Sequence, residues 1–87
     1  MSQVSLKIER VQTGIRIEKK LLKVLKGTAE FLDLSMGELL EIILLHSFEN
    51  HATFTKETLR AVKDLKKLYG LDYDVHDYKK FKEIEMP

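Results

Sequence analysis

The chain contains no cysteine, a single proline and four glycines, and its longest apolar run is the four residues 42–45. Without cysteine there can be no disulfide bond, no thiolate nucleophile and no cysteine-based zinc or iron site. The apolar run is far too short to cross a membrane, and the beginning of the chain lacks the apolar stretch of a secretory signal. We therefore expect a soluble, cytoplasmic protein that does not engage a membrane.

The small size of the chain narrows the possible functions further. Its 87 residues make one small domain, and the 33% charged and 44% hydrophobic fractions are typical of a folded, soluble protein. A unit of this size has little room for a deep catalytic cleft. The sequence also has no phosphate-binding loop and no nucleophile elbow. We expect no catalysis and no cofactor.

Charge is unevenly distributed, although the net charge is only +1. Residues 1–27 carry a formal charge of +5, residues 28–52 carry −5 without any Lys or Arg, and the remainder carries +1. A basic first third beside an acidic middle indicates that one edge of the molecule meets an anionic partner. The alternative is that both regions are solvated helix faces.

Apolar spacing predicts a mostly helical protein. The segments 19–32, 36–49 and 55–70 each repeat apolar residues at helical intervals, and a short fourth helix is predicted near residues 75–81. The middle helix is apolar around most of its circumference, so one packing partner cannot cover it.

Local signals mark the helix ends. Glu18 can cap the first helix, and Ser35 with Glu38 forms a capping-box pattern at the start of the second. Thr55 can cap the third helix, and Gly70 fits a left-handed conformation at its end.

Residues 11–17 have a different pattern, with Val11, Thr13, Ile15 and Ile17 alternating with more polar residues. Period-two alternation predicts a half-buried strand, and a lone strand leaves its edges without partners. A second copy could supply an antiparallel partner strand while the apolar middle helix packs on its mate. The residues predicted for this dimer core are Ile15, Ile17, Leu39, Ile42, Ile43 and Leu45. Alternatively, a turn at residues 13–14 could join 7–12 to 15–18 as a hairpin within one chain.

A strand followed by two helices and a capping serine within about 40 residues resembles the ribbon-helix-helix family of dimeric DNA-binding repressors. Residues 14–44 carry the resemblance. It implies a mostly α homodimer with one N-terminal strand per chain paired antiparallel across the dimer. Residues 1–10 would form an N-terminal arm, residues 11–49 the ribbon-helix-helix core and residues 50–87 a C-terminal helical extension.

The resemblance also implies a DNA site. In this family the paired strands lie in the major groove, so the outward positions Gln12, Gly14 and Arg16 would read bases, with Arg suited to guanine and Gln to adenine. The first amides of the second helix would hold a phosphate, and nearby basic side chains would bind further phosphates. The residues expected at phosphates are Lys7, Arg10, Lys19, Lys20, Ser35, Met36 and Gly37. The function implied is sequence-specific DNA binding by a transcriptional repressor.

Two other functions are compatible with the sequence. The protein could be an interaction module, such as an antitoxin-like factor, whose residues 54–85 bind a partner protein, or a dimeric scaffold that has lost DNA binding. A metal site is not expected, because His46 and His51 are five residues apart and do not share a helix face. Residues 72–83 superficially resemble a calcium loop but lack its sixth-position glycine.

Overall fold

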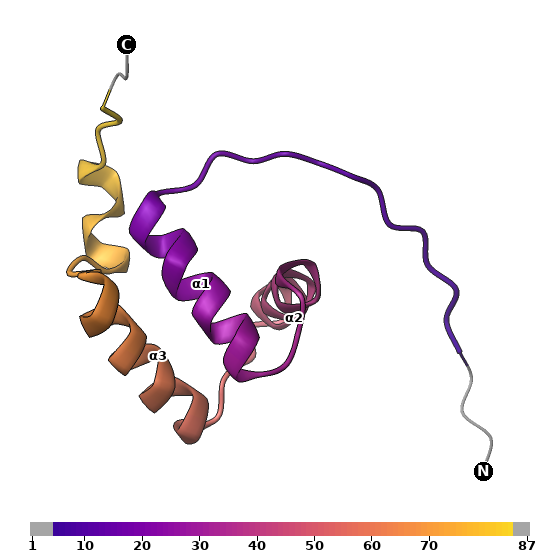
Figure 1. The fold of residues 1–87 in the computed structure, drawn as a ribbon. Helices are drawn as coiled ribbons and strands as arrows, with labels where there is room; N and C mark the ends of the chain where they lie inside the picture. Colours follow the sequence, from indigo (N-terminus) through magenta and orange to yellow (C-terminus); the bar gives the residue numbers. More distant parts are fainter. Residues whose placement is uncertain (1–4, 85–87) are drawn as a thin grey trace.

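The computed structural model describes residues 5–84, and their regular structure consists of helices alone (Figure 1). In chain order these are α1 (Lys19–Phe31), α2 (Met36–Phe48), α3 (Lys56–Tyr69) and the 3-10 helix η1 (Val75–Lys80). The three long helices predicted from apolar spacing are confirmed. The short fourth helix is present as a 3-10 helix.

The helix ends follow the signals in the sequence. The Glu18 carboxylate accepts hydrogen bonds from the amides of Lys20 and Leu21, both at 3.0 Å, which fixes the start of α1. Thr55 caps α3, and Gly70 ends it with a φ of 69°, where glycine is favoured because a Cβ would be strained. These local interactions explain why the helix boundaries were predictable.

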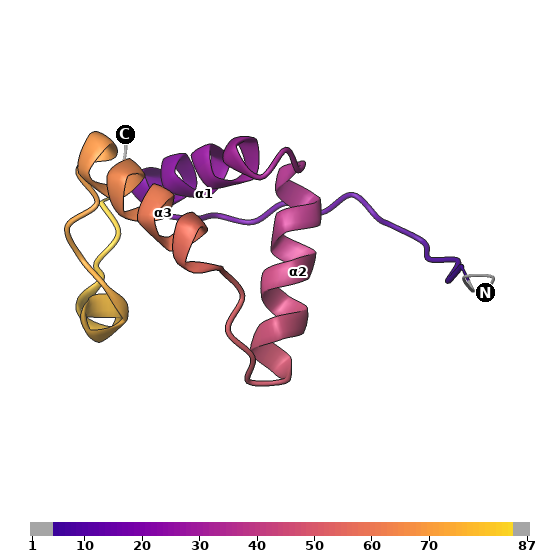
Figure 2. The ribbon, with the colours of Figure 1, turned by 90° about the horizontal axis from the view of Figure 1, so that it is seen from below.

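Helices α1 and α3 lie side by side and antiparallel (Figures 1 and 2). Gly27 makes the close approach possible, because a Cβ at this position would stand 2.8 Å from Cδ2 of Leu65. Val24, Thr28 and Ala29 of α1 are buried, and the Thr28 hydroxyl donates to the Val24 carbonyl at 2.8 Å. This helix pair is the packed centre of the molecule.

Helix α2 crosses the α1–α3 pair at a steep angle, and its far end extends away from it (Figure 2). Leu39, in its first half, is the one large side chain among the described residues that is fully buried. Farther along, Leu44, Leu45 and Phe48 are exposed. The expectation that α2 is buried on several sides is therefore not met within a single chain.

The predicted N-terminal strand is wrong. Residues 5–18 run as an extended segment without strand pairing, and no backbone hydrogen bond joins residues 5–17 to another described residue. Val11 is 78% exposed and Ile15 67% exposed, so the alternating apolar residues do not face a core. A strand needs a second extended segment to pair with, and the described part of this chain offers none.

This finding overturns the ribbon-helix-helix fold class, because its defining strand pair is missing from residues 5–84. The hairpin alternative is wrong for the same reason, since segments 7–12 and 15–18 are not paired. The fold that replaces both is a three-helix arrangement with an extended leading segment and a short 3-10 helix.

The chain after α3 returns to the beginning of α1. Leu71 is buried, and the Tyr73 hydroxyl donates to the Glu18 carboxylate that caps α1. The Tyr73 ring packs edge-on against Phe81, with ring centroids 4.8 Å apart. The region around η1 is therefore attached to the rest of the fold at a defined place.

Candidate nucleic-acid interface

Four exposed lysines project from α1. We call this set, Lys19, Lys20, Lys23 and Lys26, the α1 lysine face. Lys19, Lys23 and Lys26 are spaced four and three residues apart, which places them along one side of the helix. The buried residues of α1 occupy the opposite side, so packing against α3 turns these three lysines toward solvent. Lys20 lies four residues before the buried Val24, on another side of the helix, and is exposed in the first turn. None of the four lysines takes part in an ion pair within residues 5–84.

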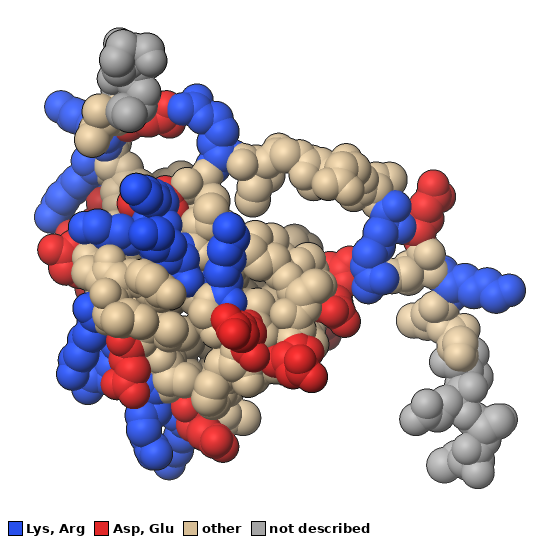
Figure 3. Space-filling view, in the orientation of Figure 1, with Lys and Arg blue, Asp and Glu red and all other residues tan. Residues whose placement is uncertain are grey.

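Helix α3 extends this positive surface. The Lys23 ammonium lies 5.8 Å from the centre of the Tyr69 ring, which connects the first half of α1 with the end of α3. Lys66 and Lys67 lie in that last turn of α3. Figure 3 shows Lys and Arg side chains gathered where α1 begins and α3 ends, whereas Asp and Glu lie over the far end of α1. A group of positive side chains therefore lies on the helix pair, where α1 begins and α3 ends.

The positions predicted to read bases lie on the extended segment. Gln12, Gly14 and Arg16 are all exposed, and a Cβ added to Gly14 would meet nothing within 4 Å. The Arg16 guanidinium, however, is paired with the Glu83 carboxylate near the other end of the chain. A base could be contacted by Arg16 only after this ion pair is broken.

Arg10 is paired in a similar way. Its Nε and Nη2 atoms each donate to a different oxygen of the Glu41 carboxylate at 2.9 Å. This two-point contact raises the pKa of Arg10 and lowers the pKa of Glu41. Arg10 thus anchors the extended segment to α2, a role that sequence reasoning missed. The partners are 31 residues apart, so no local pattern could reveal the pair.

The start of α2, where a phosphate site was predicted, carries a capping box formed by Ser35 and Glu38. The Ser35 hydroxyl accepts from the Glu38 amide, and the Glu38 carboxylate accepts from the Ser35 amide, both at 3.1 Å. The hydrogen bond from the Ser35 amide, followed by the interaction with the Ser35 side chain, lowers the pKa of Glu38. The ionised carboxylate repels a phosphate approaching Met36 and Gly37.

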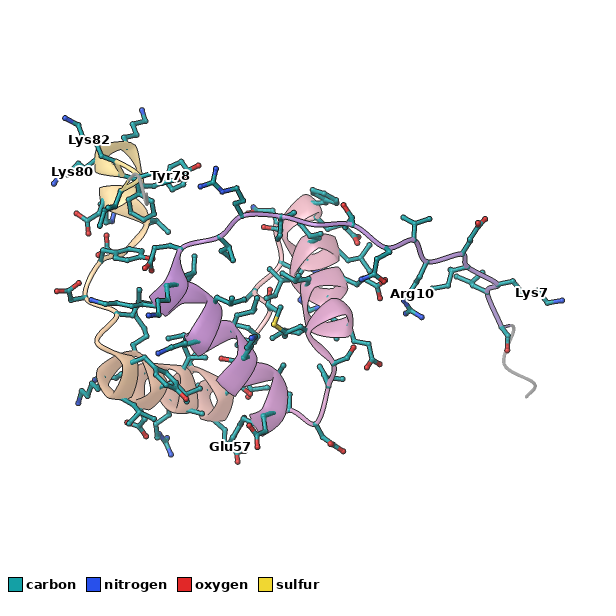
Figure 4. All side chains as sticks on the ribbon, turned by 45° about the horizontal axis from the view of Figure 1, so that its top comes forward. Lys7, Arg10, Glu57, Tyr78, Lys80 and Lys82 are labelled. Atoms are coloured by element: carbon teal, nitrogen blue, oxygen red, sulfur yellow. The ribbon has the colours of Figure 1, made fainter. Side chains whose placement is uncertain are left out.

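The predicted phosphate contacts are not gathered in one place. Lys7 and Arg10 extend beyond α2 on the leading segment (Figure 4). Lys19 and Lys20 lie at the start of α1, and Ser35 lies beyond its other end. Within this set, Lys19 and Lys20 are the residues that join a larger positive surface.

The predicted dimer-core residues are also spread over different environments. Leu39 is buried inside its own chain, Ile17, Ile42 and Ile43 are half-buried, and Ile15 and Leu45 are exposed. The sequence did not distinguish these environments, because apolar character alone does not show which side of α2 meets α1.

His46 and His51 contact neighbouring groups of the chain. His46 Nδ1 lies 3.1 Å from the Ala52 carbonyl oxygen, within hydrogen-bond distance, and the His46 and His51 rings are edge-to-face with centroids 6.4 Å apart. Across residues 5–84 there is no group of three or more His, Cys, Asp or Glu side chains arranged to hold a metal ion.

A hydrogen-bonded pair supports the beginning of the α1 lysine face. Burial, followed by the hydrogen bond to Glu18, raises the pKa of Tyr73 to about 12. The same hydrogen bond is the largest cause of the lowered pKa of Glu18. The ionised Glu18 caps α1 just before Lys19, so this pair fixes the point from which the lysine face starts.

Comparison with known proteins does not identify the chain. No family model, curated protein or solved structure matches it. In the described residues, no helix has both the length and the apolar character needed to span a membrane.

Proposed function

We propose that the protein binds double-stranded DNA through backbone phosphates, with the α1 lysine face as the main contact. The observation that carries this proposal is the exposure of four lysines that form no ion pair within residues 5–84, beside the basic end of α3. Lysines arranged in this way neutralise phosphates and release counterions, which favours binding at low salt. By occupying a promoter such a protein represses transcription, and this is the role that we propose for it in the cytoplasm.

Sequence preference, in this proposal, comes from the extended segment. Gln12 and Arg16 are exposed there, and their side chains can form paired hydrogen bonds with adenine and guanine respectively. DNA must displace Glu83 from Arg16 before Arg16 can reach a base. The phosphate contacts of α1 hold the duplex while this exchange takes place.

A salt series on matched variants tests the lysine face. The affinity for a random-sequence duplex is measured by fluorescence anisotropy between about 50 and 200 mM salt. Replacing two lysines of the face, Lys19→Gln and Lys23→Gln, should weaken binding and reduce the salt slope by about 2. The control, Lys79→Gln with Lys82→Gln, removes the same charge near η1. If both double variants lose the same DNA affinity, the contact is not localised on α1 and the affinity depends on net charge alone.

Base reading is tested separately by selecting sites from a random DNA pool. The wild type should enrich particular sequences, and Arg16→Ala should remove that preference while most affinity for random DNA remains. If Arg16→Ala selects the same sequences as the wild type, Arg16 does not read bases.

Self-association through α2 is a second candidate property, favoured by its exposed apolar side. Leu44, Leu45 and Phe48 share one side of α2 at helical spacing, and Phe48 is 79% exposed. A twofold contact between two copies of α2 covers both apolar surfaces at once. Sedimentation should show a dimer that Phe48→Ser with Leu45→Ser converts to a monomer. A wild type that stays monomeric at high micromolar concentration would exclude this contact.

A further inference from the structure

A groove runs along the side of α3 and combines an apolar floor with a basic rim. The open groove has a volume of about 450 Å³, and its lining includes Leu59, Val62, Lys63, Lys66, Lys67 and Leu71. Leu59 is 53% exposed at one end, whereas Leu71 is buried at the other. Lys66 and Lys67 also belong to the basic end of α3 proposed to lie near DNA, whereas the apolar floor of the groove has no role in DNA binding.

The length of the groove corresponds to a few turns of a helix. Its lining runs from Leu59 to Gly70, which corresponds to about 16 Å along α3 at 1.5 Å per residue. Gly70 has no side chain and ends α3 in a left-handed turn, so the groove stays open at that end. About three helical turns of a second helix can lie along such a length.

The charged residues of the groove indicate what kind of segment can bind there. Three lysines border the apolar floor, and Asp72 is the one acidic residue in the lining. A segment that matches this surface has apolar residues along one side and Asp or Glu beside them. A nucleic acid fits less well, because phosphates gain nothing from Leu59 and Val62 and are repelled by Asp72.

Helix α2, which carries Glu38 and Glu41, is a weaker candidate for the occupant of this groove. Glu38 of α2 is engaged in its helix cap, and Glu41 is paired with Arg10. Both carboxylates therefore already have partners. A segment with free carboxylates satisfies the groove lysines without breaking these contacts.

From these observations we infer that the α3 groove binds an acidic amphipathic helix of a partner protein. Apolar side chains of the partner cover Leu59 and Val62, and its carboxylates pair with Lys63, Lys66 and Lys67. The groove shares Lys66 and Lys67 with the basic end of α3, but it does not include the α1 lysine face. Peptide binding can therefore be lost through Leu59, and DNA binding through Lys19 and Lys23, each without the other.

The test uses a fluorescein-labelled peptide of about 14 residues, designed as a helix with leucines on one side and glutamates along both edges. Its affinity for the full chain is compared with that of a scrambled peptide of the same composition. Leu59→Ser should weaken binding of the designed peptide by about tenfold or more. The matched control is Leu68→Ser, which alters a residue of the same helix that is 71% exposed and lies outside the groove lining.

A charge experiment provides the second readout. Lys66→Gln with Lys67→Gln should weaken peptide binding several-fold and flatten its salt dependence, whereas Lys19→Gln with Lys23→Gln should leave it unchanged. The latter variant separates the two proposals, because it is the one designed to impair DNA binding. Circular dichroism confirms that each variant is folded.

Four results would overturn the inference. Equal binding of the scrambled peptide, or equal effects of Leu59→Ser and Leu68→Ser, would mean that the groove does not recognise an amphipathic helix. Loss of DNA affinity on Leu59→Ser would make the groove a nucleic-acid surface. Loss of self-association on the same substitution would identify a second copy as its occupant.

Discussion

The α1–α3 pair and the region formed by α2 with residues 5–17 differ in how they are held. The pair is joined by the close approach at Gly27, by buried threonines and by the contact of Tyr73 with Glu18. The second region depends on one buried leucine, Leu39, and on the Arg10–Glu41 ion pair. The first region therefore gives the fold its rigidity, whereas the second leaves apolar surface available for contacts.

The difference arises from how apolar residues are distributed around each helix. In α1 they occupy one side, which α3 covers. In α2 they surround most of the helix, but α1 covers only part of it. A helix that is apolar on several sides needs more than one partner, and the described chain supplies too few. This imbalance is the physical basis for expecting self-association through α2.

The largest effect should come from the single buried anchor of α2. Leu39→Ala removes a fully buried side chain and should lower the free energy of unfolding by about 2–5 kcal/mol, as measured by urea unfolding. Leu45→Ala, on the exposed side of α2, should cost less than about 1 kcal/mol. Equal costs would mean that α2 is not anchored where the structure places it.

A smaller change in stability is expected when each of two helical glycines is replaced by alanine. In Gly27→Ala the new Cβ would stand 2.8 Å from Leu65, so we expect the crowding to exceed the gain in helix propensity and to lower stability by about 1 kcal/mol. Gly37→Ala has open space around the new Cβ, so it should raise stability by up to about 1 kcal/mol. Thermal unfolding of both variants measures the difference, and stabilisation by Gly27→Ala would show that the Leu65 side chain moves aside at little cost.

A pH-dependent effect should accompany the Tyr73–Glu18 contact. The folded state raises the pKa of Tyr73 from 10.0 to about 12, so its contribution is complete below pH 10 and is lost as the pH rises from 10 to 12. The pKa of Glu18 is lowered from its ordinary value of 4.5, so its contribution is present above that pH and is lost as the pH falls below it.

Two tyrosine variants test this prediction by urea unfolding across the pH range. Tyr73→Phe should remove the loss of stability between pH 10 and 12, and it should also weaken the acid dependence that Glu18 contributes. Tyr78→Phe alters an exposed ring and should reproduce the wild-type profile. Identical profiles for Tyr73→Phe and the wild type would show that the contact does not form in solution.

The sequence predicted those parts of the fold that depend on neighbouring residues. Glu18, Ser35, Thr55 and Gly70 act within a few residues of their own positions, and the helix ends follow them closely. The strand prediction failed because alternation describes one segment only. It carries no information about whether a partner segment exists.

The candidate site, too, was predictable only where it depends on residues close together in the sequence. The exposed lysines of α1 could be foreseen from their spacing, although only Lys19 and Lys20 had been assigned to phosphates. The pairing of Arg10 and Arg16 with carboxylates could not be foreseen, because 31 and 67 residues separate the partners. The α3 groove was equally hidden, since it depends on how the chain turns after Gly70 to bury Leu71.

The most direct measurement is a nuclear magnetic resonance titration of the labelled full chain with a random-sequence duplex at low salt. We expect the largest chemical-shift changes in residues 19–26 and at the end of α3, with small changes at 42–48. Changes centred on residues 36–38 instead, or no changes at any duplex concentration, would contradict it.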